Sequence, residues 1–302
     1  MKVKKIGFVG LGAMGGPMVT RFLAAGLEVV VADLDARAVE AMQQLGATAA
    51  ADPRAVASEC EVVLCSLPTP SVVEAVVLGG TGIAQGSKVK IYVDLSTTGS
   101  VVAKRVAQGL ASRGVRAVDA PVSGGPAGVQ AGTLAIMASG DRAAFDNVEP
   151  VLQAIAKNIF YLGDEVGLGQ TAKLANNLLA ATTITATTEV LAYGMRSGLD
   201  PAVLLKIINA SSGRSFASEF ALPAGVASGN FNVGFRTELM HKDVKLCISE
   251  ADAVGAPMWI GANVAQFYSF AMSQGYGKKD VASLAEVFAE WAGVSYPFQP
   301  EA

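Results

Sequence analysis

The chain has 302 residues, of which 51% are hydrophobic and 16% charged, and its formal net charge is −3. This composition is typical of a well-packed globular protein and excludes a disordered chain. The weak negative charge supplies no basic surface for nucleic acid or an anionic membrane, so neither is an expected partner. We expect a small molecule as the ligand, and the length is sufficient for two domains, although length alone also allows one large α/β domain.

The cysteines and the N-terminus predict the compartment. Cys60, Cys65 and Cys247 show no metal-binding spacing, so we expect buried thiols in a reducing compartment and no metal site. The opening MKVKKIGFVG is too short for the apolar region of a signal peptide, and no apolar run reaches membrane length. The expected location is the cytoplasm.

A dinucleotide-binding pattern occupies the start of the chain. An apolar segment at 6–9 leads into a glycine-rich loop, a helical pattern follows to residue 23, and a second apolar segment at 27–32 ends at Asp33. The loop consists of Gly10, Leu11, Gly12, Ala13, Met14 and Gly15. A strand, this loop, a helix and a second strand ending in an acid form the dinucleotide-binding unit, in which the helix N-terminus attracts the pyrophosphate.

Asp33 bears on the choice between NAD and NADP. Its carboxylate is suited to accept hydrogen bonds from the adenosine ribose diol and to repel a 2′-phosphate. Leu34 stands where an NADP site often carries arginine, although Arg37 lies close by and keeps NADP open as the alternative. The sequence therefore favours NAD.

Strand and helix patterns continue to alternate up to about residue 163. Apolar strands are predicted within 61–68, 90–97, 115–125, 133–140 and 158–163, with helices within 69–86, 98–113 and 142–155. Ligands of open α/β sheets bind outside the carboxyl ends of the strands. We therefore expect one crevice to be lined by Leu67 and Pro68, by Ser96 and Thr97, and by Ser123, Gly124 and Gly125.

The remainder of the chain predicts helices only. Their expected ranges are 167–197, 201–210, 217–228, 236–254, 257–273 and 280–292. The first, at about thirty residues, is long for a globular protein, and we expect it to join two domains and to contribute to the interface of a homodimer or homotetramer. The predicted fold class is α/β, with an NAD(P)-binding Rossmann doubly wound sheet at 1–164. An all-α substrate and oligomerisation domain is expected at 165–302.

Five motifs resemble those of the β-hydroxyacid dehydrogenase family. FVGLGAMGGPM, DAPVSGG, GQTAKLANN, SSGRS and HKD occur in the family's order and span nearly the whole chain. The resemblance implies an NAD(P)-dependent enzyme that interconverts a small β-hydroxy acid and its semialdehyde. Lys173 would be the catalytic lysine with Asn177 beside it, and Ser123, Gly124 and Gly125 would hold the substrate carboxylate. Leu67, Pro68, Thr97 and Lys242 would line the cofactor or substrate site.

The residues themselves allow two interpretations of the lysine. Lys173 and Asn177 are spaced i to i+4, so in a helix both side chains face one ligand. The alternative is a lysine that extends to solvent and an asparagine with ordinary hydrogen bonds in the core. Burial and the positive nicotinamide ring would lower the pKa of a lysine and make it a base near neutral pH. Because the sole histidine, His241, has no obvious acidic partner beside it, we expect it to be structural or a secondary residue lining the site.

Three alternative functions remain open at this point. They are an NADPH-preferring reductase of tartronate or succinic semialdehyde, a 2-(hydroxymethyl)glutarate dehydrogenase, and a dinucleotide-binding scaffold without catalysis. Arg214 and Arg236 are candidates for substrate selection, with surface ion pairs as the alternative. The decarboxylating relatives of the family place an acid about two turns after the lysine, where this chain has Ala180, so decarboxylation is disfavoured.

Overall fold

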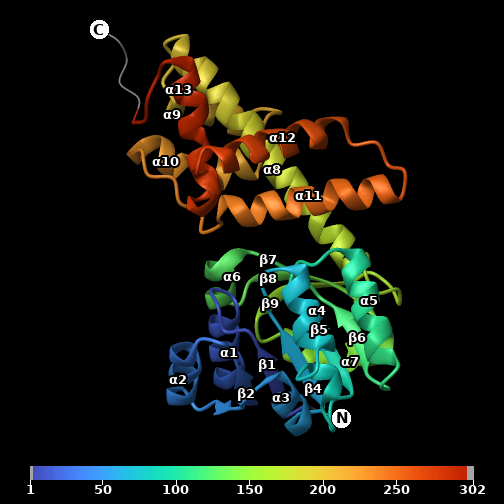
Figure 1. Ribbon diagram of the computed structural model, residues 1–302. Helices are drawn as coiled ribbons and strands as arrows, with labels where there is room; N and C mark the ends of the chain where they lie inside the picture. The colour runs from blue at the N-terminus through green and yellow to red at the C-terminus, as the bar shows by residue number, and fades with distance from the viewer. Residues whose placement is uncertain (1–2, 298–302) are drawn as a thin grey trace. The chain divides into compact units, whose positions relative to one another are not determined.

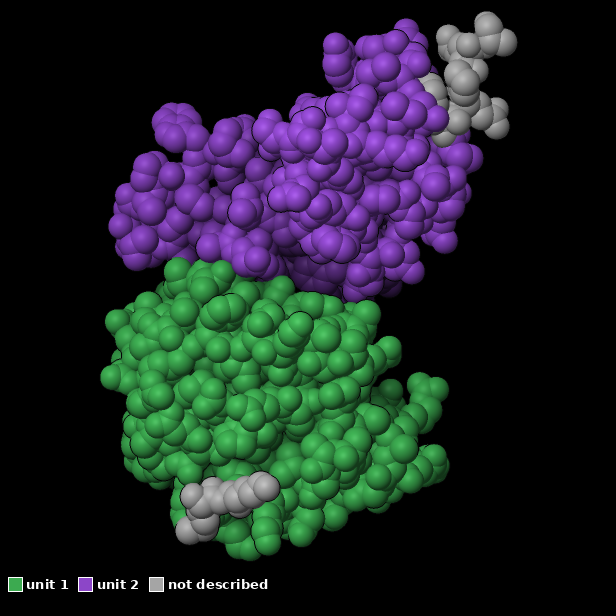
Figure 2. All heavy atoms as spheres, turned by 180° about the vertical axis from the view of Figure 1, so that it is seen from behind, with its two compact units in different colours: residues 1–173 green, residues 174–302 purple. Residues whose placement is uncertain are grey.

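The computed structural model describes residues 3–297 (Figure 1). The chain divides into two compact units, residues 1–173 and 174–302, which are coloured green and purple in Figure 2. The division falls inside helix α8 (Leu168–Arg196), which begins in the first unit. The predicted domain boundary at 164/165 stays a prediction.

The first unit contains the predicted alternation of strands and helices. Its strands are β1 (Lys5–Val9), β2 (Glu28–Ala32), β3 (Thr48–Ala49), β4 (Val62–Cys65), β5 (Ile91–Asp94), β6 (Arg116–Asp119), β7 (Val122–Ser123), β8 (Leu134–Gly140) and β9 (Ala156–Tyr161). Its helices before α8 are α1 (Gly15–Ala24), α2 (Ala36–Gln44), α3 (Pro53–Glu59), α4 (Pro70–Leu78), α5 (Ser100–Ala111), α6 (Gly125–Ala131) and α7 (Arg142–Leu152), with a 3₁₀ turn at Ile83–Gln85.

One sheet joins these strands in the order β3-β2-β1-β4-β5-β6-β8-β7, and β9 pairs with β8. The neighbouring pairs from β3 to β6 are parallel, whereas β8 runs antiparallel to both β6 and β7. Successive strands are added outward in opposite directions from the adjacent strands β1 and β4. This pair marks the switch point at which Rossmann folds bind dinucleotides. The predicted Rossmann class is confirmed.

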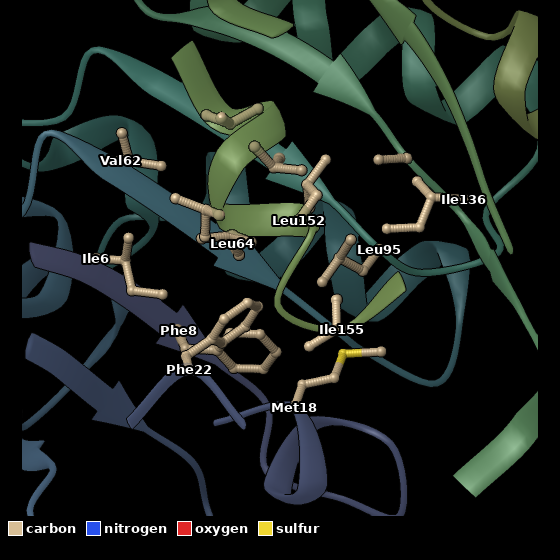
Figure 3. Close-up of a cluster of buried hydrophobic side chains, with 14 of the residues drawn as sticks. Ile6, Phe8, Met18, Phe22, Val62, Leu64, Leu95, Ile136, Leu152 and Ile155 are labelled. Carbon is tan, nitrogen blue, oxygen red and sulfur yellow. The ribbon is translucent and has the colours of Figure 1, made fainter. Parts of the chain in front are cut away.

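Both faces of the sheet are buried, which explains why its strands are apolar throughout. On one face, Ile6, Phe8 and Leu64 pack with Met18 and Phe22 of α1 (Figure 3). On the other face, a separate cluster joins alternate residues of the same strands to α3, α4 and α5. A sheet with one exposed face alternates apolar and polar residues along each strand. Parallel strands that are covered on both faces are apolar at nearly every position.

The structure adds elements that the sequence pattern left out. Helices α2, α3 and α6 are present, and residues 115–125 form two strands, β6 and β7, in place of one. The break occurs at Ala120 and Pro121, because proline supplies no N–H for a ladder. Its carbonyl oxygen accepts a hydrogen bond from Met137 instead, at 3.1 Å.

The second unit is helical in the described residues, as predicted. After α8 it contains α9 (Pro201–Asn209), a π turn at Ala217–Ala221, α10 (Pro223–Ser228), α11 (Thr237–Ala253), α12 (Trp259–Ser273), 3₁₀ turns at Tyr276–Lys278 and Val281–Leu284, and α13 (Ala285–Ala292). Its core forms around Leu178, Val244 and Tyr268. Within residues 3–297, none of the helices combines the length and apolar character that crossing a membrane would require.

Candidate active site

Two glycines of the loop after β1 are required by the backbone. Gly10 has a φ of +96°, and its N–H donates to the Ala32 carbonyl at 3.0 Å. A Cβ at Gly10 would collide with the backbone oxygen of Ser66, and one at Gly15 would collide with the backbone oxygen of Gly10. These glycines therefore permit the turn and the close approach of α1 to β1.

Gly12 differs, because a Cβ there would meet no atom within 4 Å. Gly12 and Ala13 are exposed, and α1 begins with neither a side-chain cap nor an acid in its first turn. The first N–H groups of a helix carry partial positive charge and favour an anion. The open face at Gly12 and the uncapped helix together fit the pyrophosphate of a dinucleotide.

Asp33 is fixed directly beside this loop. Its Oδ2 accepts a hydrogen bond from the Leu11 N–H at 2.5 Å, and its Oδ1 accepts one from the Asp35 N–H at 2.8 Å. Each carboxylate oxygen has further lone pairs for a ribose hydroxyl. Leu34 is fully exposed, and the Arg37 side chain is 93% exposed and pairs loosely with Asp35 at 3.7 Å.

The loops after β4 and β5 are joined by a hydrogen bond, and of the candidate residues there Pro68 is exposed and Thr97 half-buried. Ser96 Oγ accepts a hydrogen bond from the Leu67 N–H at 2.9 Å, and the Ser96 N–H donates to Asp94 Oδ1 at 2.9 Å. Pro68 and Thr97 each follow one of these anchored residues in the chain. The structure thus brings together two of the three loops of the expected crevice, the one at Leu67 and Pro68 and the one at Ser96 and Thr97.

The Ser123-Gly124-Gly125 segment joins β7 to α6. Gly124 has a φ of +128° and Gly125 a φ of +61°, so the turn is suited to glycine at both positions. Ser123 is half-buried and pairs with Ala135 across the antiparallel strands. Gly124 is exposed and Gly125 half-buried, so part of this turn is open to a ligand, as a carboxylate-binding loop requires.

Lys173 and Asn177 are both buried on α8, with exposed fractions of 7% and 5%. Their i to i+4 spacing places them on one face of this helix, and the residues between them at 175 and 176 are exposed. A lysine whose ammonium extends into solvent does not fit such burial. The solvent-extending alternative is therefore excluded for Lys173, and the catalytic role of the pair stays a prediction.

Asp243 of α11 contacts the candidate residue Asn177, and the sequence pattern did not predict this contact. Its Oδ2 accepts a hydrogen bond from Asn177 Nδ2 at 2.6 Å, and its Oδ1 forms an ion pair with Lys242 Nζ at 2.9 Å. Since an ionised carboxylate only accepts, it fixes which end of the Asn177 amide faces it. The HKD motif contained Asp243, but its partner lies 66 residues away.

Comparisons with known proteins identify the family. The model for the NAD binding domain of 6-phosphogluconate dehydrogenase matches residues 5–163, and that for the NAD-binding region of NADP-dependent 3-hydroxyisobutyrate dehydrogenase matches 167–288. The chain is 36% identical to 2-(hydroxymethyl)glutarate dehydrogenase of Eubacterium barkeri, over 96% of this chain and 97% of the relative. It is 38% identical to 3-hydroxyisobutyrate dehydrogenase of Pseudomonas aeruginosa, over 87% and 91% of the two chains. The chain belongs to the β-hydroxyacid dehydrogenase family.

A solved β-hydroxyacid dehydrogenase shares the architecture. The structure of Mycobacterium tuberculosis 3-hydroxyisobutyrate dehydrogenase with L-serine matches with a TM-score of 0.85 and 30% identity, covering 95% of this chain and 99% of that one. The protein is accordingly an NAD(P)-dependent oxidoreductase of β-hydroxy acids, as the motifs predicted.

Other polar residues of this β-hydroxyacid dehydrogenase have structural partners. Arg214 lies 3.7 Å from Glu219, and Arg236 lies 2.7 Å from Glu238, with exposed side chains in both arginines. These are the surface ion pairs of the alternative interpretation. His241 Nε2 lies 3.1 Å from Ser269 Oγ. Burial and the charge of Lys245 lower the pKa of this histidine.

The cysteines lie in the apolar core. All three thiols are free and buried, as predicted. Among residues 3–297, no group of three or more metal-ligating side chains is placed to hold an ion. Cys65 Sγ lies 2.7 Å from the Tyr92 hydroxyl, and burial raises the pKa of this thiol well above its usual range.

Asp94 accepts the hydrogen bond from the Ser96 N–H, and its buried carboxyl group makes the free energy of unfolding depend on pH. Burial raises the pKa of Asp94 from 3.8 to about 6, opposed by its hydrogen bonds with Ser96. Because the folded state binds this proton more tightly than the unfolded state, the buried charge destabilises the protein above about pH 6. That destabilisation disappears as the pH falls toward 3.8.

We expect the free energy of unfolding, measured relative to Asp94→Asn, to rise by roughly 2 to 3 kcal/mol from about pH 7 to about pH 4. Urea unfolding of both proteins across this range measures it. A difference between wild type and Asp94→Asn that stays constant with pH would contradict the assignment.

Proposed function

We propose that this enzyme oxidises a small β-hydroxy acid to its semialdehyde with NAD⁺, and that Lys173 is the general base. The burial of Lys173 on α8, one turn before an anchored asparagine, is the observation that carries the proposal. Bound NAD⁺ supplies the acceptor for the hydride that leaves the substrate carbon. Lys173 Nζ takes the hydroxyl proton, and in reverse its ammonium returns a proton to the developing alkoxide.

The neighbouring residues hold the substrate in this proposal. Asn177 hydrogen-bonds the reacting oxygen, and Asp243 keeps the Asn177 amide in one orientation. Ser123, Gly124 and Gly125 bind the carboxylate through the serine hydroxyl and the backbone N–H groups. Lys242 lines the cofactor or substrate site, which its ion pair with Asp243 supports.

The cofactor preference follows from the end of β2. Asp33 is anchored by two backbone N–H groups, so its negative charge stays where the adenosine ribose of a dinucleotide binds in this fold. The 2′-phosphate of NADP would be repelled by this charge, and no arginine is adjacent to neutralise the phosphate. Leu34 follows Asp33, and the Arg37 side chain extends into solvent. We therefore assign NAD as the preferred cofactor, with the glycine loop, Leu67, Pro68 and Thr97 forming the rest of its site.

We also assign a homodimer or homotetramer in the cytoplasm. Leu179, Val190 and Tyr193 of α8 are exposed by 64%, 45% and 72%, and their spacing places them along one face of the helix. A row of large apolar side chains on a helix surface is typical of an interface.

A turnover assay tests the proposed function. The substrates are 3-hydroxyisobutyrate, 2-(hydroxymethyl)glutarate, glycerate, threonate and serine, each with NAD⁺ and with NADP⁺. We expect at least one to be oxidised, with kcat/KM about tenfold or more higher for NAD⁺ than for NADP⁺. The reason is that the 2′-phosphate of NADP⁺ would lie beside the negative charge of Asp33 with no positive charge to offset it. No turnover with any of them would contradict the dehydrogenase assignment, and a preference for NADP⁺ would favour the NADPH-dependent reductase.

A further inference from the structure

The start of α8 is capped by side chains from distant strands. Asp119, at the end of β6, accepts hydrogen bonds from the Gly167 N–H at 2.8 Å through Oδ1 and from the Gln170 N–H at 3.0 Å through Oδ2. Ser139 Oγ donates to Asp119 Oδ1 at 2.5 Å and accepts from the Gly169 N–H at 3.0 Å. The first N–H groups of this helix are thus satisfied by residues far earlier in the chain.

A second contact fixes the rotation of the same helical turn. The Gln170 side chain is fully buried, and its Oε1 accepts hydrogen bonds from the Thr98 and Gly99 N–H groups at 2.9 and 3.2 Å. Its Nε2 donates to the Ser96 carbonyl at 3.0 Å. A Cβ at Gly169 would collide with the Met137 carbonyl oxygen. The turn therefore has little freedom to slide or rotate against β8 and the loop after β5.

Lys173 lies one turn after these anchored residues, on the same helix. A helix held at its first turn transmits its position and rotation to the next turn, because its backbone hydrogen bonds are continuous. We propose that Asp119 is a positioning residue that fixes where α8 presents the side-chain nitrogen of Lys173; this inference rests on the proposed function of Lys173.

Asp119 does not act on the substrate directly. It is 2% exposed, and three N–H or O–H groups donate to its two oxygens. Each of these contacts is internal to the first unit. Asp119 therefore affects the reaction only through the position of α8. A displacement of the reacting Lys173 nitrogen by about 1 Å is sufficient to lower the rate about a hundredfold.

The test is Asp119→Asn. The amide has the same shape as the carboxylate, but its NH2 group is a donor where the carboxylate oxygen accepted a hydrogen bond from the helix. We expect kcat to fall about 10- to 100-fold while the dissociation constant of NADH changes less than about threefold. Asp52→Asn is the matched control: Asp52 accepts from the Ala55 N–H at 2.7 Å and caps α3, which carries none of the proposed site residues. Its kcat should stay within about twofold of wild type.

A double variant separates positioning from general damage. If Asp119 acts through Lys173, then Asp119→Asn added to Lys173→Ala should lower the residual rate by less than about threefold. A full additional loss in that background would overturn the inference, as would a wild-type kcat in Asp119→Asn. If Lys173→Ala itself kept near-normal turnover, the proposed function would fail instead, so the two failures are distinguishable.

Ser139→Ala keeps the inference testable if Asp119→Asn does not fold. It removes the hydroxyl that joins Asp119 to the Gly169 N–H and leaves the carboxylate in place. We expect a smaller loss in kcat, about 3- to 10-fold, with NADH binding preserved. A wild-type kcat in this variant would likewise overturn the inference.

Discussion

Replacement of Lys173 by alanine should lower kcat about a thousandfold or more while NADH still binds. The substrate proton would have no acceptor on the protein, and general acid–base catalysis contributes about 10²- to 10⁴-fold to a rate. A thousandfold loss corresponds to about 4 kcal/mol of transition-state stabilisation. The glycine loop and Asp33 belong to other elements and are unaffected, so cofactor affinity should remain.

Steady-state kinetics and a fluorescence titration with NADH measure the two effects separately. Lys206→Ala, on the exposed side of α9, removes an identical side chain and is the control that should leave both unchanged. Added methylamine should restore part of the rate of Lys173→Ala, because a free amine supplies the missing base. Near-normal turnover in Lys173→Ala would rule out its role as the general acid/base.

Replacement of Gly12 by valine should prevent cofactor binding without unfolding the protein. The position has no positive φ and a Cβ there meets no atom within 4 Å, so the side chain is accommodated in the free enzyme. It would then occupy the space through which the pyrophosphate approaches the loop. We expect the dissociation constant of NADH to rise more than about 100-fold, or about 2.7 kcal/mol.

The other glycines give the controls. Gly80→Val places a side chain in equally open space beyond the C-terminal end of α4 and should change neither Tm nor NADH affinity. Gly15→Ala should lower the Tm, since its Cβ collides with the Gly10 backbone. Calorimetry and NADH titration of the three variants check this contrast. Wild-type affinity in Gly12→Val would show that the dinucleotide does not bind at this loop.

The sequence by itself determined the fold class and the motifs of the site. The glycine spacing after β1, the acid after β2 and the i to i+4 spacing of Lys173 and Asn177 are local patterns, so the residues between them suffice to predict their geometry. Apolar strands alternating with helices likewise predicted a parallel sheet. Helices α2 and α3 were left out although Asp35 and Asp52 mark their N-caps.

Only the tertiary structure decided which polar groups support these motifs. Asp119 and Gln170 stand inside motifs that the sequence analysis quoted, yet nothing local indicates that one caps the helix of the other. Asp243 meets Asn177 across 66 residues, and the antiparallel pairing of β6 with β8 places Ser139 beside Asp119. Local spacing specifies helices, strands and turns, whereas partners distant in the chain depend on how these elements pack. The lysine was therefore evident from the sequence, and the residues that hold its helix were not.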